Sequence, residues 1–204
     1  SFFGIAGLPI WLVIILSIIA AGIIGLIVER VLFRPMIGQP LITAVIMTLA
    51  LFYVLMGAMH LIWPGALTRL PPFIPQQPLH FGSIVISVEF LLAFVVALIC
   101  FGSLTLFFQR TDVGLSMRAT AEEHQVAQSL GINVNTVFSL SWGIAIMLAG
   151  IAGILLGSIY GVHTSLAPLG LKAFPVILLG GLQSIPGAML GGLLLGLIET
   201  IAAG

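Results

Sequence analysis

Long apolar stretches alternate with short polar ones along this chain. The apolar stretches cover residues 5–28, 41–63, 84–108 and 134–160. Each is long enough to cross a hydrocarbon core of ~30 Å as a helix, which takes about 20 residues. The stretches also lack the alternation of apolar and polar positions that a barrel strand shows over about ten residues. The pattern therefore predicts four membrane-spanning helices before residue 161.

The apolar region that follows Lys172 is interrupted at its centre. It reads AFPVILLGGLQSIPGAMLGGLLLGLIET, and its helix-breaking residues are Gly180, Gly181, Pro186 and Gly187. It forms either one interrupted span or a half-helix that turns back near Gln183 before a final span. Because breaks at membrane depth need protein or water around them, we favour an interrupted or re-entrant segment near 172–187. The expected fold class is all-α, a polytopic transmembrane helix bundle with at least five membrane segments.

The longest polar interval, residues 110–133, separates two of these spans. Within it, Thr120 and Glu123 have the spacing of a capping box, in which each side chain bonds the other's backbone N–H. Gly131 stands where a left-handed helix C-cap is expected. The interval therefore predicts one short helix over residues 121–130, with a small apolar face. Such a helix between two spans is suited to docking onto a partner in the water phase.

Basic residues indicate the orientation of the chain. Residues 29–40 and 110–133 hold four of the six Lys and Arg residues, and they fall on one side if three spans precede the second interval. Pro35 and Pro40 mark the first interval as a loop. Cytoplasmic loops carry an excess of Lys and Arg, so we expect both intervals to be cytoplasmic. Arg69 and Lys172 are left on the other side.

Small residues recur every fourth position along the fourth span. Two such sets occur, the first at Ala145, Ala149, Gly153, Gly157 and Gly161, and the second, in the last segment, at Ala188, Gly192 and Gly196. Faces of this kind let helices approach closely in lipid. Two uses stay open, packing within the subunit, which we favour, and a dedicated dimer face.

Composition supports the membrane assignment and excludes several other classes. The chain is 60% hydrophobic and 6% charged, with a formal net charge of zero, whereas soluble domains carry about 25% charged residues. No basic surface indicates nucleic acid binding. Because the chain begins without methionine and stops inside an apolar run, we expect residues to be missing at both ends.

Catalytic and metal-binding patterns are absent from the sequence. The four histidines do not stand at metal-ligand spacing, and a Ser-His-Asp set cannot be argued with Asp112 as the single aspartate. Lys172 is followed by Ala, so there is no phosphate-binding P-loop. Glu89 is the ionisable group that we place in a span. We expect no enzyme, metal or cofactor, and if the chain moves a solute, its energy comes from outside the chain.

Four segments resemble the permeases of branched-chain amino-acid ABC importers. They are ERVLFRPM (29–36), TDVGLSMRATAEEHQVAQSLGINVNTV (111–137), MLAGIAGILLG (147–157) and KAFPVILLGGLQSIPGAMLGGLLLGLIE (172–199). The resemblance covers most of the chain and identifies residues 1–204 as one partial permease domain with a cytoplasmic coupling loop at 110–133. It departs from many relatives at His124-Gln125-Val126-Ala127, where only Ala127 keeps a small residue of the common pair.

The resemblance implies a division of labour. A helix in the coupling loop would dock onto an ATP-binding subunit through the capping residue Thr120 and the contacts Glu122, Glu123, Val126, Ala127, Leu130 and Gly131. The implied assembly holds a second permease subunit, identical or homologous, two ATP-binding subunits that bind the ATP, and an extracytoplasmic binding protein. Its implied location is a bacterial-type inner membrane. Branched-chain amino acids, other amino acids, urea and amides stay open as substrates.

Two other classes of function stay open beside the importer. A channel or facilitator would conduct a solute without an ATPase, and a membrane scaffold would use the polar interval to recruit a cytoplasmic protein. The interrupted region near 172–187 argues against a scaffold, which needs no broken helix.

Overall fold

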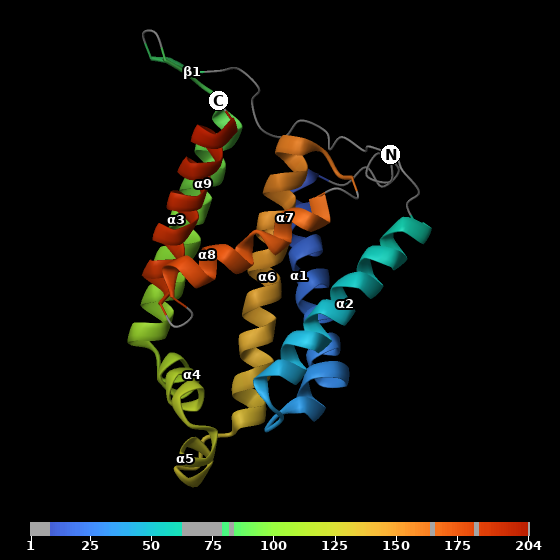
Figure 1. Cartoon of the computed structure of the whole chain (residues 1–204), viewed down its shortest axis with the longest axis vertical. Coiled ribbons are helices and arrows are strands. Elements are labelled where there is room, and N and C mark those ends of the chain that lie inside the picture. Colours follow the sequence, from blue (N-terminus) through green and yellow to red (C-terminus); the bar gives the residue numbers. More distant parts are fainter. Residues whose placement is uncertain (1–8, 63–78, 82–83, 164–165, 182–183, 204) are drawn as a thin grey trace.

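The computed structural model describes residues 9–62, 79–81, 84–163, 166–181 and 184–203. Its long helices are α1 (Ile10–Val28), α2 (Leu41–Ile62), α3 (Val88–Arg110), α6 (Val134–Tyr160) and α9 (Ile185–Ala203) (Figure 1). The shorter elements are the π-helical turn η2 (Glu29–Phe33), the 3-10 turn η3 (Arg34–Met36), α4 (Asp112–Glu122), α5 (His124–Ser129), α7 (Ala167–Leu171), α8 (Ala173–Gly180) and the strands β1 (Leu79–Phe81) and β2 (Ile84–Ile86).

Five helices of the described chain are long and apolar enough to cross a membrane. The predicted all-α bundle with at least five membrane segments is therefore confirmed. Many apolar side chains on these helices point outward, among them Ile24, Val54 and Ile99, which are 57%, 67% and 63% exposed. An apolar outer surface of this kind suits a chain whose solvent is lipid, because lipid tails are as apolar as the side chains themselves.

Two predicted boundaries were wrong. The third span begins at Val88 and not at Ile84, because residues 84–86 pair antiparallel with β1, Phe81 opposite Ile84. Two isoleucines and a valine in a row favour a strand. The connection over 29–40, expected to be a loop, stays helical through η2 and η3 to Met36. Pro35 does not end the helical conformation there. It stands in the first turn of η3, where a backbone N–H would have no partner within the helix.

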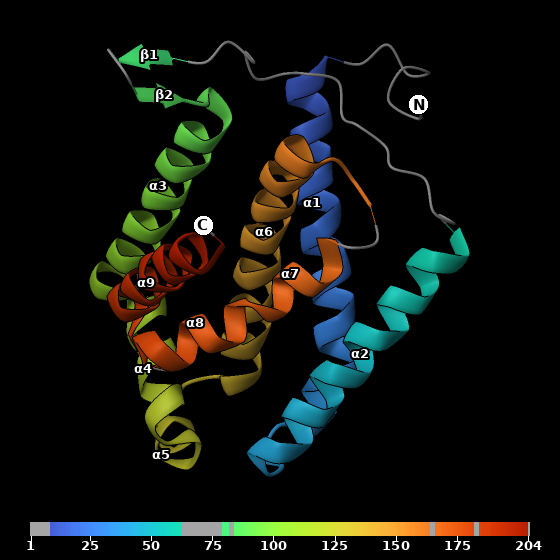
Figure 2. The ribbon, with the colours of Figure 1, turned by 45° about the horizontal axis from the view of Figure 1, so that its top comes forward.

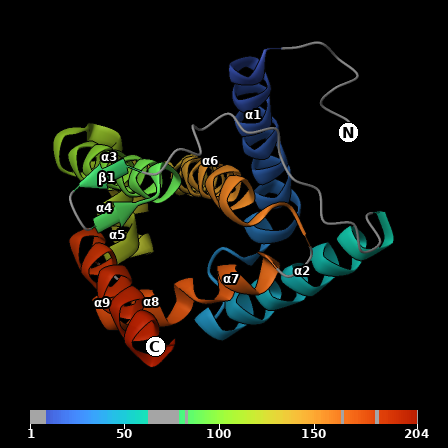
Figure 3. The same cartoon turned by 90° about the horizontal axis from the view of Figure 1, so that it is seen from above.

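Glycines bring α1 and α6 into close contact. A Cβ on Gly25 would lie 2.5 Å from Cδ1 of Ile146, and one on Gly150 would lie 3.3 Å from Cβ of Ala21. In lipid, helices associate through such close packing and not through the hydrophobic effect. Seen from above, the elements form an open ring, with α3, α6 and α1 along one side and α9, α8, α7 and α2 along the other (Figure 3).

The interruption near 172–187 is present as a helical hairpin. Helix α8 ends at Gly180, Gly181 takes a positive φ of 89°, and α9 begins at Ile185. Ser184 caps α9, since its hydroxyl accepts a hydrogen bond of 3.0 Å from the backbone N–H of Gly187. The two helices pack against each other, and α9 also contacts α3, which it crosses at an angle (Figure 2). Gln183, where the sequence predicts the turn, lies outside the described residues.

Candidate functional site

The predicted coupling loop begins with a sharp turn of the chain at the end of α3. Thr111 makes the turn, with its hydroxyl donating to the Phe107 carbonyl (2.7 Å) and accepting from the Gly114 N–H (3.0 Å). Gly114 is needed here because a Cβ would lie 2.5 Å from the Phe107 carbonyl oxygen and 2.6 Å from Cα of Phe108. Helix α4 is therefore held directly against the end of the membrane span.

The predicted capping box is wrong. Thr120 lies inside α4 and is 2% exposed, and its hydroxyl donates to the Ser116 carbonyl at 2.7 Å. The helix breaks three residues later, at Glu123, whose backbone is extended (φ −152°, ψ 109°) and occupies the N-cap position of α5. The loop thus holds two helices, α4 and α5, in place of one over 121–130. The cap that starts the first of them is Thr111, which the sequence reasoning missed.

The predicted C-cap at Gly131 is confirmed. Gly131 has a φ of 83°. Its N–H donates to the Gln128 carbonyl and the N–H of Ile132 donates to the Ala127 carbonyl, both at 3.0 Å. This pair of bonds is the Schellman arrangement, which satisfies carbonyls that the helix end would otherwise leave unpaired. Gly131 therefore terminates α5 and directs the chain into α6.

The predicted docking residues fall into two groups. Thr120 and Ala127 are buried, at 2% and 1% exposure, so they pack within this chain. The others are exposed, with Val126 at 54% and Leu130 at 74%. We name the exposed group the coupling surface: Glu122, Glu123, Val126, Leu130 and Gly131. It lies at the end of the molecule opposite β1 and β2 (Figure 1). Its role in docking stays a prediction.

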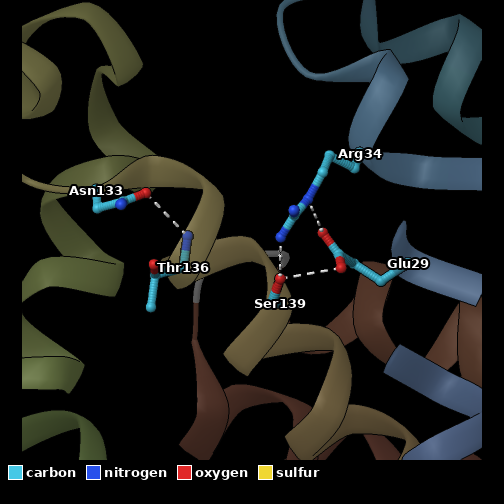
Figure 4. A network of polar contacts seen from close by, with 5 residues as sticks. All are labelled: Glu29, Arg34, Asn133, Thr136 and Ser139. Atoms are coloured by element: carbon cyan, nitrogen blue, oxygen red, sulfur yellow. Dashed lines mark hydrogen bonds and ion pairs between the residues drawn. The ribbon is translucent and has the colours of Figure 1, made fainter. Parts of the chain in front are cut away.

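A buried polar network ties this end of α1 to α6 (Figure 4). Glu29 is 1% exposed. Its carboxylate accepts from the Ser139 hydroxyl at 2.9 Å and from Nε of Arg34 at 3.4 Å, and Nη2 of Arg34 donates to the Ser139 hydroxyl at 2.8 Å. The three groups close a triangle in which the buried carboxylate uses both oxygens. Sequence reasoning missed it, because Ser139 stands 110 residues from Glu29.

The π-helical turn is what brings Glu29 and Arg34 together. In an α-helix, five steps of about 100° would leave these side chains about 140° apart around the axis. In η2 the backbone N–H of Arg34 bonds the Glu29 carbonyl, so the two residues stand one turn apart on one face. Turns of this type occur often at functional sites. Here the turn aims an ion pair at α6.

A pocket of about 290 Å³ separates this network from the coupling loop. On one wall, Phe33 stacks on Trp142 with ring centroids 4.0 Å apart. On another wall, the rings of His124 in α5 and Phe138 in α6 pack edge to face, with their centroids 5.5 Å apart. The first residue of α5 thus faces the connection between α1 and α2 across this pocket.

The two sets of small residues are not placed alike. Ala145, Ala149 and Gly153 are exposed, whereas Gly157 and Gly161 are buried. In α9, Ala188 and Gly192 are half-buried and Gly196 is exposed. The glycines of α6 that face α1 are instead Gly143 and Gly150. What covers the exposed members stays a prediction.

Glu89 stands in the first turn of α3, where the sequence placed it. Among the described residues, no group of three His, Cys, Asp or Glu could hold a metal ion.

Comparison with known proteins identifies the family. A family model described as branched-chain amino acid transport system / permease component matches residues 2–204. This chain belongs to that family. It is 38% identical over 194 residues to the permease protein BraD of Pseudomonas aeruginosa, covering 92% of this chain and 63% of BraD. It is 32% identical to LivH of Salmonella typhimurium over 194 residues (92% and 63%) and to LivH of Escherichia coli over 202 residues (91% and 65%).

Membership in the permease family confirms the resemblance and identifies the chain as a multi-pass membrane protein. All three relatives are named as high-affinity branched-chain amino acid transport system permease proteins. The chain spans 63–65% of their lengths. No solved structure matches it significantly.

Proposed function

We propose that this chain is the membrane-spanning permease subunit of an ABC importer for branched-chain or related amino acids. The observation that carries the proposal is the family match over residues 2–204. The names of BraD and LivH, which are similar to this chain over about nine tenths of its length, supply the substrate class. An extracytoplasmic binding protein would deliver the amino acid, and a second permease subunit would complete the pathway.

The energy for transport enters through the coupling surface. Two ATP-binding subunits each dock on one permease, and their approach on binding ATP moves the docked helices. Exposed Val126 and Leu130 supply apolar contacts for this docking, and Glu122 and Glu123 supply charges. The Thr111 hydroxyl bonds both the Phe107 carbonyl of α3 and the Gly114 N–H of α4. Because α4 is fixed to the end of α3 in this way, its motion is passed into the span rather than absorbed by a loose loop.

The coupling surface faces the cytoplasm of a bacterial-type inner membrane. Four of the six basic residues lie at this end of the molecule, Arg30 and Arg34 in η2 and η3 and Arg110 and Arg118 in α3 and α4. An excess of Lys and Arg is typical of cytoplasmic loops. Residues 29–40 and 110–133 are therefore both on the cytoplasmic side, and β1 and β2 are on the extracytoplasmic side.

The test is purification of the full-length protein from its native membrane in mild detergent, with mass spectrometry of what co-purifies. An ATP-binding protein should accompany the wild type and be lost with the double variant Val126→Ser/Leu130→Ser. Leu115→Ser is the matched control, because Leu115 is an exposed leucine (58%) at the same end but outside the coupling surface. It should keep the partner.

Transport is then measured in proteoliposomes with the co-purified subunits and binding protein. Leucine uptake that requires ATP supports the importer. A protein that purifies without any ATP-binding subunit and passes leucine without ATP would instead be a channel.

A further inference from the structure

An ion pair spans the two helices of the interrupted segment. Nζ of Lys172, at the start of α8, lies 2.8 Å from Oε1 and 3.0 Å from Oε2 of Glu199 in α9. The two side chains are 50% and 48% exposed. Glu199 stands within the apolar span Ile185–Ala202. An ionisable residue inside a span is costly and marks a functional site by default.

Glycine contacts fix the position of this pair. A Cβ on Gly180 would overlap the carbonyl oxygen of Gly187, and a Cβ on Gly191 would overlap the carbonyl oxygen of Val176. The backbones of α8 and α9 therefore touch at two places, four residues apart on each helix. Lys172 lies four residues before Val176, and its long side chain reaches the Glu199 carboxylate. The hairpin holds both charges at its open end.

The charges stand among apolar side chains. Phe174 is 61% exposed, and Leu197 and Ile198 next to Glu199 are 60% and 56% exposed. Glu199 is close to the end of α9 and both charges are half-exposed, so water or a polar ligand can reach them. The C-terminal end of α9, the helix that carries Glu199, lies near β1 and away from α5 (Figure 1). This is the outer half under the orientation proposed above.

We propose that Lys172 and Glu199 bind the charged head of a zwitterionic amino acid during transport. The Lys172 ammonium takes the α-carboxylate and the Glu199 carboxylate takes the α-ammonium, so one internal ion pair is exchanged for two with the ligand. The two charges of an amino acid flank a single carbon, which matches a pair of protein charges in direct contact. The proposal rests on the proposed function and chooses amino acids over urea and uncharged amides.

The exchange is energetically feasible. An exposed ion pair contributes only about 0–1 kcal/mol, so opening it costs little. Each new contact is a charge-assisted hydrogen bond, the stronger class of such bonds. Without ligand, the two residues neutralise each other and avoid two isolated charges in an apolar region. The exposed apolar side chains beside them suit an aliphatic substrate.

The competing explanation is a brace that only joins α8 to α9. Charge reversal separates the two, because Lys172→Glu/Glu199→Lys rebuilds a brace but presents the charges in the wrong places for the substrate. Lys172→Gln, Glu199→Gln and the reversed double variant are compared in the full importer in proteoliposomes. Thr200→Ala is the matched control, because Thr200 is the neighbour of Glu199 and its hydroxyl bonds the Gly196 carbonyl of its own helix.

We expect both single variants and the reversed variant to lose ATP-driven leucine uptake at least ten-fold, and Thr200→Ala to keep it. Uptake within two-fold of wild type in either single variant would overturn the proposal. So would its return in the reversed variant. A wild type that does not import amino acids would refute the proposed function as well, which separates the two failures.

A measurement on the wild type removes any dependence on how the variants fold. Lys172 is half-exposed, so its acetylation by an amine-reactive reagent can be followed by mass spectrometry of the peptide that contains it. Leucine should lower its labelling at least three-fold relative to lysines of the partner subunits. Leucinamide lacks the carboxylate but has the same reagent-consuming amine, so it should not lower the labelling of Lys172. Equal labelling with both ligands would overturn the proposal.

Discussion

Replacing Gly180 by alanine tests whether direct backbone contact holds the α8–α9 hairpin together. The new Cβ would overlap the carbonyl oxygen of Gly187 and lie 2.6 Å from the backbone nitrogen of Ala188. Both neighbours are backbone atoms of α9, so neither can rotate away as a side chain can. The helices must separate, and the contact of Gly191 with the Val176 carbonyl is then lost too.

The size of the effect follows from two opposing contributions. Overpacking a close contact costs typically 1–3 kcal/mol, and rigid backbone on the far side places Gly180→Ala near the upper value. Alanine also gains up to about 1 kcal/mol of helix propensity over glycine. Gly196→Ala in α9 has that gain without the clash, because no described atom outside its own helix would lie within 4 Å of its Cβ. The two variants should differ by about 2–3 kcal/mol.

The assay is the thermal unfolding midpoint of the purified protein in detergent. For a chain of this size, 1 kcal/mol corresponds to a shift of about 2–4 °C, so the midpoints should differ by about 4–12 °C. Gly180→Ala should lie below wild type and Gly196→Ala at or above it. A Gly180→Ala protein as stable as the Gly196→Ala protein would show that the two helices do not meet at this glycine.

Two further substitutions probe the opposite end of the molecule. Gly131→Val should lower leucine uptake per ATP hydrolysed, because a β-branched residue resists a φ of 83° at a cost of about 1–2 kcal/mol. Gly131→Asn, which tolerates that conformation, should keep it; equal coupling in both would remove the cap from the mechanism. Ser139→Ala should lower stability by about 1–3 kcal/mol, because the buried Glu29 carboxylate loses a hydrogen bond. Ser141→Ala is the control, since its hydroxyl bonds its own helix, and equal melting of the two variants would contradict the network.

The spans and the helix breaks were predictable because they depend on local sequence. Helix α6 has the predicted bounds Val134–Tyr160, since a polar start and an apolar run of that length leave few alternatives. Gly131 was predictable for the same reason, because only glycine adopts its conformation without strain. Gly180 and Gly181 stood out as a break, although their contact with Gly187 needed the structure.

The missed features depend on residues far apart or on competition between local signals. Both Thr111 and Thr120 can cap a helix, and the choice is made by Gly114, which lets α4 fold against the end of α3. The partner of Glu29 could not be read from the sequence, because it comes from α6. Small residues on α6 indicated close packing, but the face turned toward α1 depends on helix rotation about the axis. Periodicity alone does not determine that rotation.

The π-helical turn at Glu29–Phe33 makes chain length a constraint of its own at this place. Each residue added to or removed from a helix turns everything beyond it by about 100°. The close contact of Gly25 with Ile146 requires one rotation of α1 about its axis. The hydrogen bond from Arg34 to Ser139 requires a different rotation of the residues that follow α1. The five residues of η2 reconcile those rotations. Substitutions within the turn leave the rotation between the two segments unchanged. A one-residue deletion or insertion there changes it, so that the membrane half of α1 and its polar end can no longer both keep their contacts with α6.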